Sequence, residues 1–417
     1  MKRFFLMSIM GLLLSCNSKG MTKEAAFAPT VYYYSTIAFV ETPLTYIKGS
    51  IPLTKEDALQ RNHYRFTYDG LHRLVSVAFY NGQNPRNPNH TANLFTLAHR
   101  MEFSYGSDKE TITFFGAHGE QVNVLGDCRE FVYSLDDKGY RKSLAFIDDK
   151  DQQVENDWGI ATYQWTYLSD GSIIEDRFNT KGESVAIRPG FEFFRLRLYF
   201  NPLGHIALMQ NIDDDGNLVE NSSGASQDRI TTNADGNFIK WEVLDNGATL
   251  EKGNGPNVAI GIQEFNEYGY EVTLEHRDEN NKLMHNNYGI CKSRTSFDQF
   301  GNIVERRFYD EKGNASRHTS AGYHMLKIQW DASGNHRESL SYYDRNGTPI
   351  EHRTRGYHKV RYSYNGNDVL EQISYLDRNE HLVNRKDNGA AYIKYTYDAK
   401  GQRSGVVLYD VDGNAIQ

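Results

Sequence analysis

The sequence predicts an all-β protein, in which about eleven antiparallel β units of ~33 residues form a repeat array with an elongated or spiralling sheet. Three observations favour this fold class. The chain is 13% aromatic although only 39% of it is hydrophobic, and disordered chains are poor in aromatic residues. Apolar and polar side chains alternate over short segments, which is typical of strands with one buried face. A turn motif also recurs at nearly constant spacing along the 417 residues.

The turn motif consists of an aromatic residue, then Asp or Asn, then two residues and Gly. Asp or Asn opens such a turn by bonding its own backbone, and Gly supplies the positive φ that closes it. We call the Gly place the anchor position. After the first interval the anchor positions lie 30 to 34 residues apart, and nine of the eleven have an aromatic residue four places earlier. They are His72, Lys109, Gly139, Gly171, Gly204, Gly236, Gly269, Gly301, Gly334, Asp368 and Gly401.

A second turn of the same kind follows about twelve residues after many anchor positions, for example at Gly313 and Gly347. Each unit is therefore expected to contain two or three short antiparallel strands. One such unit cannot bury its aromatic face alone, so neighbouring units must stack.

This pattern resembles the YD (Rhs-type) repeats of bacterial surface and toxin-associated proteins, with the core G-x-x-x-x-Y-x-Y-D-x-x-G. The copy with the best match runs from Gly389 through Tyr395, Tyr397 and Asp398 to Gly401. The resemblance covers 62–417, which we assign to the repeat array, and it implies a strand-rich, spiralling or elongated sheet. In that family the repeats often enclose a C-terminal toxin, and neither a toxin nor a self-cleavage segment follows the repeats in this sequence. MORN-type hairpin arrays are the second resemblance.

The chain begins with a basic pair, Lys2 and Arg3, and an apolar stretch that ends at Cys16. The stretch is too short for a permanent membrane span and has the order of a secretory signal. The sequence Leu-Leu-Ser-Cys resembles a bacterial lipobox. We therefore expect a signal peptide at 1–15, lipidation of Cys16, and a membrane partner reached through the lipid anchor in the cell envelope. Asn17 in place of Asp favours the outer membrane if the host has two membranes.

Residues 16–61 do not repeat, and we expect them to form a tether and an N-terminal cap that covers the open edge of the array. Loss of Lys2 and Arg3 would change the formal charge from −8 to −10. An acidic chain of this kind argues against nucleic acid as a partner.

Two groups of residues are weak candidates for metal ligands. Asp213, Asp215 and Asn217 resemble the start of a calcium loop, although they fall where the repeat needs its second turn. His285, His318 and His352 each lie sixteen residues before an anchor position, and Cys291, His324 and His358 each lie ten before one. In a meander of two or three strands per unit, equivalent residues are about 10 Å or more apart, too far to share one ion. We therefore expect neither a metal nor any other cofactor.

The sequence predicts a non-catalytic envelope lipoprotein that binds a glycan or protein ligand, or acts as a scaffold, through its long surface. Aromatic residues that the core does not require, such as Tyr33, Trp158 and Phe193, are weak candidates for ligand contacts. The sequence has no phosphate-binding loop, no nucleophile elbow and no zinc-protease motif. Two alternatives remain open: a glycan- or peptide-acting envelope enzyme with a site in a groove, and an accessory or immunity lipoprotein of a toxin system.

Overall fold

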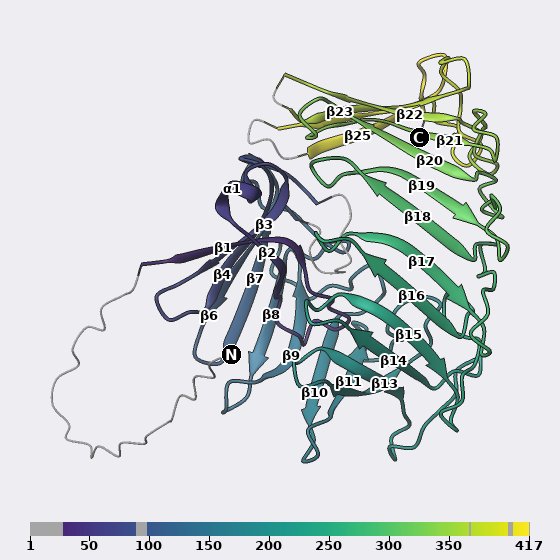
Figure 1. The fold of residues 1–417 in the computed structure, drawn as a ribbon. Helices are drawn as coiled ribbons and strands as arrows, with labels where there is room; N and C mark the ends of the chain where they lie inside the picture. Colours follow the sequence, from purple (N-terminus) through teal and green to yellow (C-terminus); the bar gives the residue numbers. More distant parts are fainter. Residues whose placement is uncertain (1–27, 89–97, 367, 399–402, 417) are drawn as a thin grey trace, which may run out of the picture.

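A computed structural model describes residues 28–88, 98–366, 368–398 and 403–416 (Figure 1). Within them, the chain forms one open antiparallel sheet of 26 strands and a single short helix, which confirms the predicted fold class. No helix among these residues is long and apolar enough to cross a membrane. Residues 1–15, Cys16 and Gly401 lie outside the described residues.

The elements follow one another in the order of the chain. They are β1 (Thr30–Ile37), β2 (Gly49–Leu53), α1 (Lys55–Ala58), β3 (Asn62–Tyr68), β4 (Leu74–Asn81), β5 (Asn84–Pro85), β6 (Arg100–Tyr105), β7 (Lys109–Phe115), β8 (Glu130–Leu135), β9 (Arg141–Ile147), β10 (Thr162–Tyr167), β11 (Ile173–Phe178), β12 (Arg195–Phe200), β13 (Ile206–Asn211), β14 (Gln227–Thr232), β15 (Phe238–Leu244), β16 (Ile260–Phe265), β17 (Glu271–Arg277), β18 (Lys292–Phe297), β19 (Ile303–Tyr309), β20 (Met325–Trp330), β21 (Arg337–Tyr343), β22 (Lys359–Tyr364), β23 (Leu370–Leu376), β24 (Tyr392–Tyr397), β25 (Arg403–Tyr409) and β26 (Ala415–Ile416).

The sheet is a meander. Strand β1 lies between β2 and β3, and from β3 onward each long strand pairs with the next one along the chain. Each repeat unit therefore adds two strands, joined at the anchor turn. At most of these turns an Asp or Asn side-chain oxygen accepts backbone bonds, as Asp298 does from the amides of Phe300 at 2.9 Å and Asn302 at 2.8 Å. Gly106 and Leu168 take that place in two of the turns. The anchor residues His72 and Asp368, which are not Gly, also adopt positive φ values, 58° and 60°. The anchor predicted at Lys109 is wrong, because this residue begins β7 instead of closing a turn.

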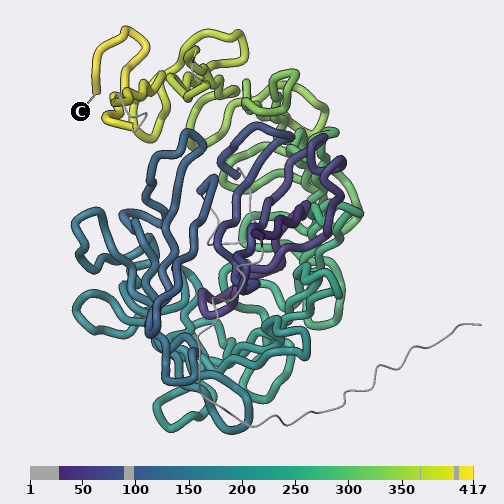
Figure 2. Tube along the Cα trace, turned by 90° about the vertical axis from the view of Figure 1, so that its left-hand side faces the viewer, coloured from purple at the N-terminus to yellow at the C-terminus, as the bar shows by residue number. Residues whose placement is uncertain are grey.

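The sheet curls because most hairpins carry an irregularity at the same place. In nine hairpins of the described chain, the strand register shifts at the aromatic or equivalent residue four places before the anchor position, for example between Glu264 and Phe265. A bulge of this kind bends its strand and increases the local twist. Repeated along the array, the bends bring the first strands to face the middle of the sheet (Figures 1 and 2).

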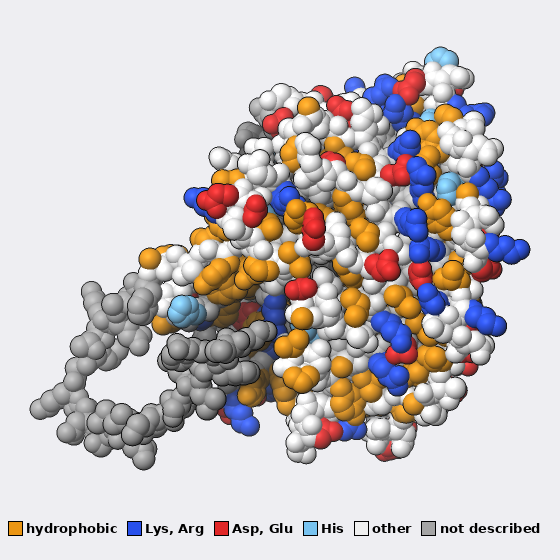
Figure 3. All heavy atoms as spheres, viewed as in Figure 1, with side chains coloured by type: hydrophobic (Ala, Val, Ile, Leu, Met, Phe, Trp, Pro, Cys, Tyr) orange, Lys and Arg blue, Asp and Glu red, His pale blue; other side chains and the backbone are white. Residues whose placement is uncertain are grey.

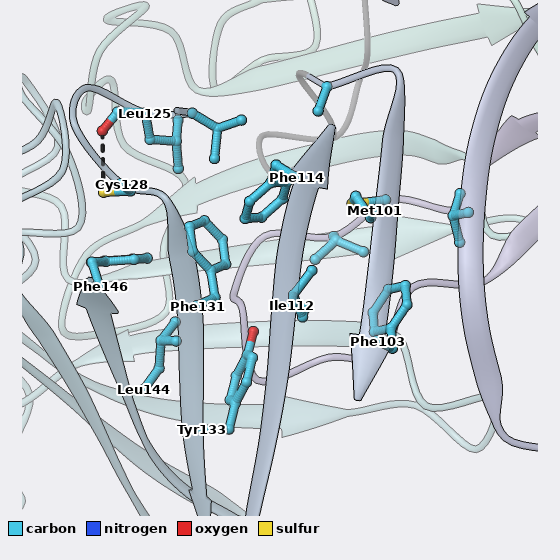
Figure 4. Close-up of a cluster of buried hydrophobic side chains, with 14 of the residues drawn as sticks. Met101, Phe103, Ile112, Phe114, Leu125, Cys128, Phe131, Tyr133, Leu144 and Phe146 are labelled. Carbon is cyan, nitrogen blue, oxygen red and sulfur yellow. Dashed lines mark hydrogen bonds between the residues drawn. The ribbon is translucent and has the colours of Figure 1, made fainter. Parts of the chain in front are cut away.

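The core lies on the inner face of the curl. In the first half of the chain it includes alternate residues of β6 to β9, such as Met101, Phe114, Phe131 and Phe146, which Figure 4 shows side by side. Two further clusters lie within 187–243 and 342–375. The predicted period-two aromatic positions therefore serve mainly as core.

Residues 38–48, which we call the inner segment, connect β1 to β2 and fill part of the hollow. The carbonyl of Pro43 accepts hydrogen bonds from the Tyr133 hydroxyl at 3.0 Å and the Arg141 guanidinium at 2.9 Å. Glu41 pairs with Arg188, and Thr42 donates to the buried Glu175. The N-terminal region therefore contacts strands far along the chain as well as extending the sheet edge.

The N-terminal strands also contact the rim of anchor turns between residues 201 and 335, which we call the docking turns. The amide of Phe39 donates to Gly236 at 2.9 Å, and that of Asn62 donates to Phe300 at 2.8 Å. The Lys48 ammonium donates to the Leu203 carbonyl at 3.1 Å. At Gly269 an added Cβ would lie 2.8 Å from the Thr36 hydroxyl, so Gly there permits close approach as well as positive φ. The docking turns therefore hold the curled sheet against the first strands and the inner segment.

Candidate functional site

A cavity of about 360 Å³ lies where the docking turns meet the first strands. One wall comes from β1, β3 and β4, and the other comes from β15 to β20. Its lining includes eight aromatic residues, namely Phe39, Tyr64, Phe79, Phe238, Phe265, Tyr270, Phe297 and Trp330. A cavity of this size with a few polar groups in an apolar lining is typical of a small-molecule site.

Ring contacts across the junction and within one wall hold aromatic side chains of the cavity in place. Phe39 stacks on Phe238 across the junction, with ring centroids 4.4 Å apart and an interplanar angle of 21°. Tyr270 stacks on Phe297 with centroids 5.0 Å apart. Since both pairs are fixed before any ligand arrives, the cavity presents preformed flat apolar surfaces.

Three hydroxyl groups of residues that line this cavity are enclosed by protein, and none has a partner within strict hydrogen-bond geometry. They are the side chains of Ser35 and Thr36 in β1 and the phenol of Tyr270. Leaving such groups unsatisfied costs about 1–3 kcal/mol each, so each one requires an explanation. Burial raises the pKa of the Tyr270 hydroxyl. The Ser35 hydroxyl lies nearby and opposes part of this rise, although the two groups do not meet strict hydrogen-bond geometry. The phenol is therefore a neutral donor at physiological pH.

Arg86 supplies a cation to the cavity wall. Its Nη1 donates to the amide oxygens of Asn62 at 3.0 Å and Asn302 at 2.9 Å, and to the Gly334 carbonyl at 2.8 Å. The guanidinium also lies 4.8 Å from the ring centre of Trp330. Burial lowers the pKa of Arg86 to about 10, which still leaves it charged at neutral pH.

Glu271 is the carboxyl group that lines the cavity. It accepts a hydrogen bond from the Gln263 amide at 2.9 Å. Burial raises its pKa, while the nearby Arg306 opposes that rise. The cavity thus combines aromatic faces with hydroxyl, amide, carboxyl and guanidinium groups that can donate or accept hydrogen bonds.

The three aromatic residues that the sequence singled out for ligand contact lie outside this cavity. Phe193 is fully buried and packs edge-on against Phe191. Trp158 packs partly buried against the first core cluster, and Tyr33 in β1 contacts the ring of His63. Sequence reasoning missed the cavity because its aromatic residues occupy the positions that predict core, and its two walls are about 200 residues apart in the chain.

The structure also places the two groups of candidate metal ligands that the sequence suggested. Asp213 closes its own turn, accepting the Asn217 amide at 2.8 Å and its side-chain amide at 3.1 Å, while Asp215 is exposed. His318 lies between the rings of Tyr288 and Tyr323, and His352 lies against Tyr342 and Tyr357. His285 instead contacts Glu311 at 2.9 Å, near Cys291. The in-phase histidines are therefore not brought together.

The two described cysteines are free and buried, and burial raises the pKa of each thiol to about 12. Neither is prepared as a nucleophile, since the reactive form is the thiolate.

No family model and no curated protein matches the sequence. Among solved structures, the chain is similar to "TcdB2-TccC3-TEV" (11% identity, TM-score 0.26, 85% of this chain and 17% of that one) and to "TcdB2-TccC3-Cdc42" (10%, 0.23, 91% and 21%). A porin-like protein from Bacteroides uniformis ATCC 8492 matches at 12% identity and a TM-score of 0.17, over 94% of this chain and 93% of that one. The chain spans about a fifth of the length of the first two of these chains, and TM-scores this low assign no family.

Proposed function

We propose that this protein is an envelope-anchored, ligand-binding β-repeat protein that holds a small saccharide in the aromatic cavity. The observation that carries this proposal is the preformed aromatic lining of the cavity, with the polar groups of Arg86 and Glu271 in the same lining and the buried hydroxyls of Ser35, Thr36 and Tyr270 just behind it. A sugar ring offers an apolar face for stacking and hydroxyl groups for buried donors and acceptors. Lipidation at Cys16 would keep such a binder at the membrane.

The cavity volume suits a mono- or disaccharide, and Arg86 favours a sugar that carries a carboxylate or several acceptor oxygens. The outer surface offers a weaker case for recognition. On the face shown in Figure 3, hydrophobic side chains gather beside the N-terminal strands, while basic and acidic side chains are interspersed along the right-hand edge. On this face, acidic side chains lie among the more numerous basic ones at that edge and offset part of their charge.

The test is a calorimetric titration of the full chain with glucose, galactose, mannose, N-acetylglucosamine, N-acetylmuramic acid, maltose and cellobiose. We expect at least one sugar to bind with a single site per chain. Tyr270→Phe and Ser35→Ala should each weaken that binding by about tenfold, because each removes one buried hydrogen bond of about 1–1.5 kcal/mol. Neither change should lower the unfolding temperature, since each also removes an unsatisfied polar group.

Tyr140→Phe is the matched control, because this tyrosine is 53% exposed and lies outside the cavity. It should leave binding unchanged. Failure of every sugar to bind, or binding that is insensitive to both cavity variants, would contradict the proposal.

A further inference from the structure

We infer that His285, Cys291 and Glu311 form a binding site for one transition-metal ion of the Zn²⁺ class. Their three ligand atoms all lie within 4.8 Å of one another, and His285 Nδ1 is 2.9 Å from Glu311 Oε1. The site lies at the edge of the sheet opposite the docking turns, so it is separate from the aromatic cavity.

The fold brings the three residues together through the pairing of β18 with β19. Cys291 directly precedes β18, and its amide donates to the Tyr309 carbonyl at 3.2 Å. That bond places the turn after β19, which carries Glu311, beside the thiol. The amide of Met284 donates to the His276 carbonyl at 3.0 Å, which holds the adjacent His285 against the same edge.

The donor set selects the metal. The Cys291 thiol is protonated without metal, and it would release its proton to solvent when the ion binds, because coordination deprotonates a ligating thiol. The resulting thiolate, with an imidazole and a carboxylate, suits Zn²⁺, whereas Ca²⁺ and Mg²⁺ prefer oxygen ligands alone. Zinc bonds of about 2.0–2.3 Å require ligand atoms within roughly 4 Å of one another. The His285 and Glu311 side chains are 41% and 46% exposed, so both can rotate by the small distance needed. Three protein ligands leave the fourth position open to a water molecule.

The next two repeat units lack this combination of metal ligands at the equivalent positions. Their histidines His318 and His352 take the place of His285, but Arg345 and Arg378 stand where Glu311 does. The residues in the place of Cys291 are His324 and His358, whose Nδ1 atoms bond the carbonyls of Ser316 at 2.9 Å and Ile350 at 3.0 Å. A cation in place of the carboxylate repels a metal ion, and the engaged imidazoles are turned to the backbone.

Cys128 is the matched internal control. It is also fully buried, but its thiol donates to the Leu125 carbonyl at 3.4 Å, and no His or acid joins it in a metal-ligand cluster of the described residues (Figure 4). A buried cysteine in this fold therefore need not bind metal.

The experiment is titration of the metal-free full chain with Co²⁺ and then Zn²⁺, followed by absorption spectroscopy. We expect one equivalent of Co²⁺ to give visible bands of a tetrahedral site and a near-ultraviolet thiolate charge-transfer band, both removed by one equivalent of Zn²⁺. Cys291→Ser should abolish the charge-transfer band, and His285→Gln and Glu311→Gln should each weaken affinity by more than about tenfold, because each removes one ligand.

Cys128→Ser and Cys16→Ser should behave as the parent chain does. Since His285 and Glu311 are exposed, their variants should keep the parent circular-dichroism spectrum, which keeps the test valid even if Cys291→Ser misfolds. No stoichiometric metal, or binding that survives loss of His285 and Glu311, overturns the inference.

Discussion

Replacement of Arg177 with methionine is expected to lower the free energy of unfolding by about 3–5 kcal/mol, measured by urea denaturation. Arg177 and its partner Glu175 lie in β11 with side-chain exposures of 0% and 1%, and they pair at 2.6 Å. The guanidinium also donates to the Phe193 carbonyl at 2.8 Å. Removal of one partner leaves the Glu175 carboxylate buried without its counter-charge, and that loss is costly.

The same change in another repeat provides the control. Glu305 and Arg307 in β19 have the same spacing and the same 2.6 Å separation, but Arg307 is 46% exposed. Arg307→Met should cost at most about 1 kcal/mol, because water screens an exposed pair. Equal losses for the two substitutions would show that Arg177 is not buried as described. Because the Glu175 carboxylate also accepts the hydroxyl of Thr42, the Arg177 variant should loosen the inner segment as well.

The second large effect concerns pH. Asp228 in β14 is 5% exposed, and it accepts a hydrogen bond from the Asn254 amide at 2.9 Å. Burial first, and then the charge of Glu41, raise the pKa of Asp228 to about 8, although Arg188 opposes the rise. An unfolded aspartate has a pKa of about 3.9, so between these values the folded chain holds a proton that the unfolded chain has lost. The stability should therefore fall as the pH rises from about 4 to 8, and then level off.

Asp228→Asn keeps the acceptor oxygen and removes the titration. We expect this variant to be more stable than the parent by a few kcal/mol at pH 8, and by much less at pH 5, because the slope can reach about 1.4 kcal/mol per pH unit. Denaturant unfolding at pH 5, 6, 7 and 8 measures the difference. Asp215→Asn, on an exposed turn, should leave the slope unchanged. If the stability gain of Asp228→Asn over the parent were smaller at pH 8 than at pH 5, the assigned direction of the pKa shift would be wrong.

Much of the fold could be predicted from local chemistry. The turn motif identified the hairpins, and it held even where His72 and Asp368 replace Gly, because the Asp or Asn three residues earlier still closes the turn. The alternation of Tyr64 and Phe66 identified a buried face. These features depend on neighbours in the sequence, which is why one sequence reveals them.

The curl and the cavity could not be predicted in this way. The bend of each hairpin depends on a register shift that no single residue type specifies, and the closure depends on the sum of many bends. Ser35 meets Tyr270 only after that closure, so nothing near Ser35 in the sequence indicates a ligand site. The row of in-phase histidines includes His285, but that row compares the same position in successive repeat units. Glu311 occupies a different position, in the turn that follows, so the row could not identify it as a partner of His285.

The most direct test of this account is cross-linking of the inner segment to a docking turn. Lys48 and Leu203 are both exposed, and the Lys48 ammonium lies 3.1 Å from the Leu203 carbonyl. In the chain carrying Lys48→Cys and Leu203→Cys, a short bismaleimide should give an intrachain cross-link, detected by mass spectrometry of the digest. The pair Lys48→Cys and Asn217→Cys should not link, because Asn217 lies beyond the far end of β13, roughly 20 Å along the strand. Absence of the first cross-link, or equal yield from both pairs, would contradict the closed curl on which the aromatic cavity depends.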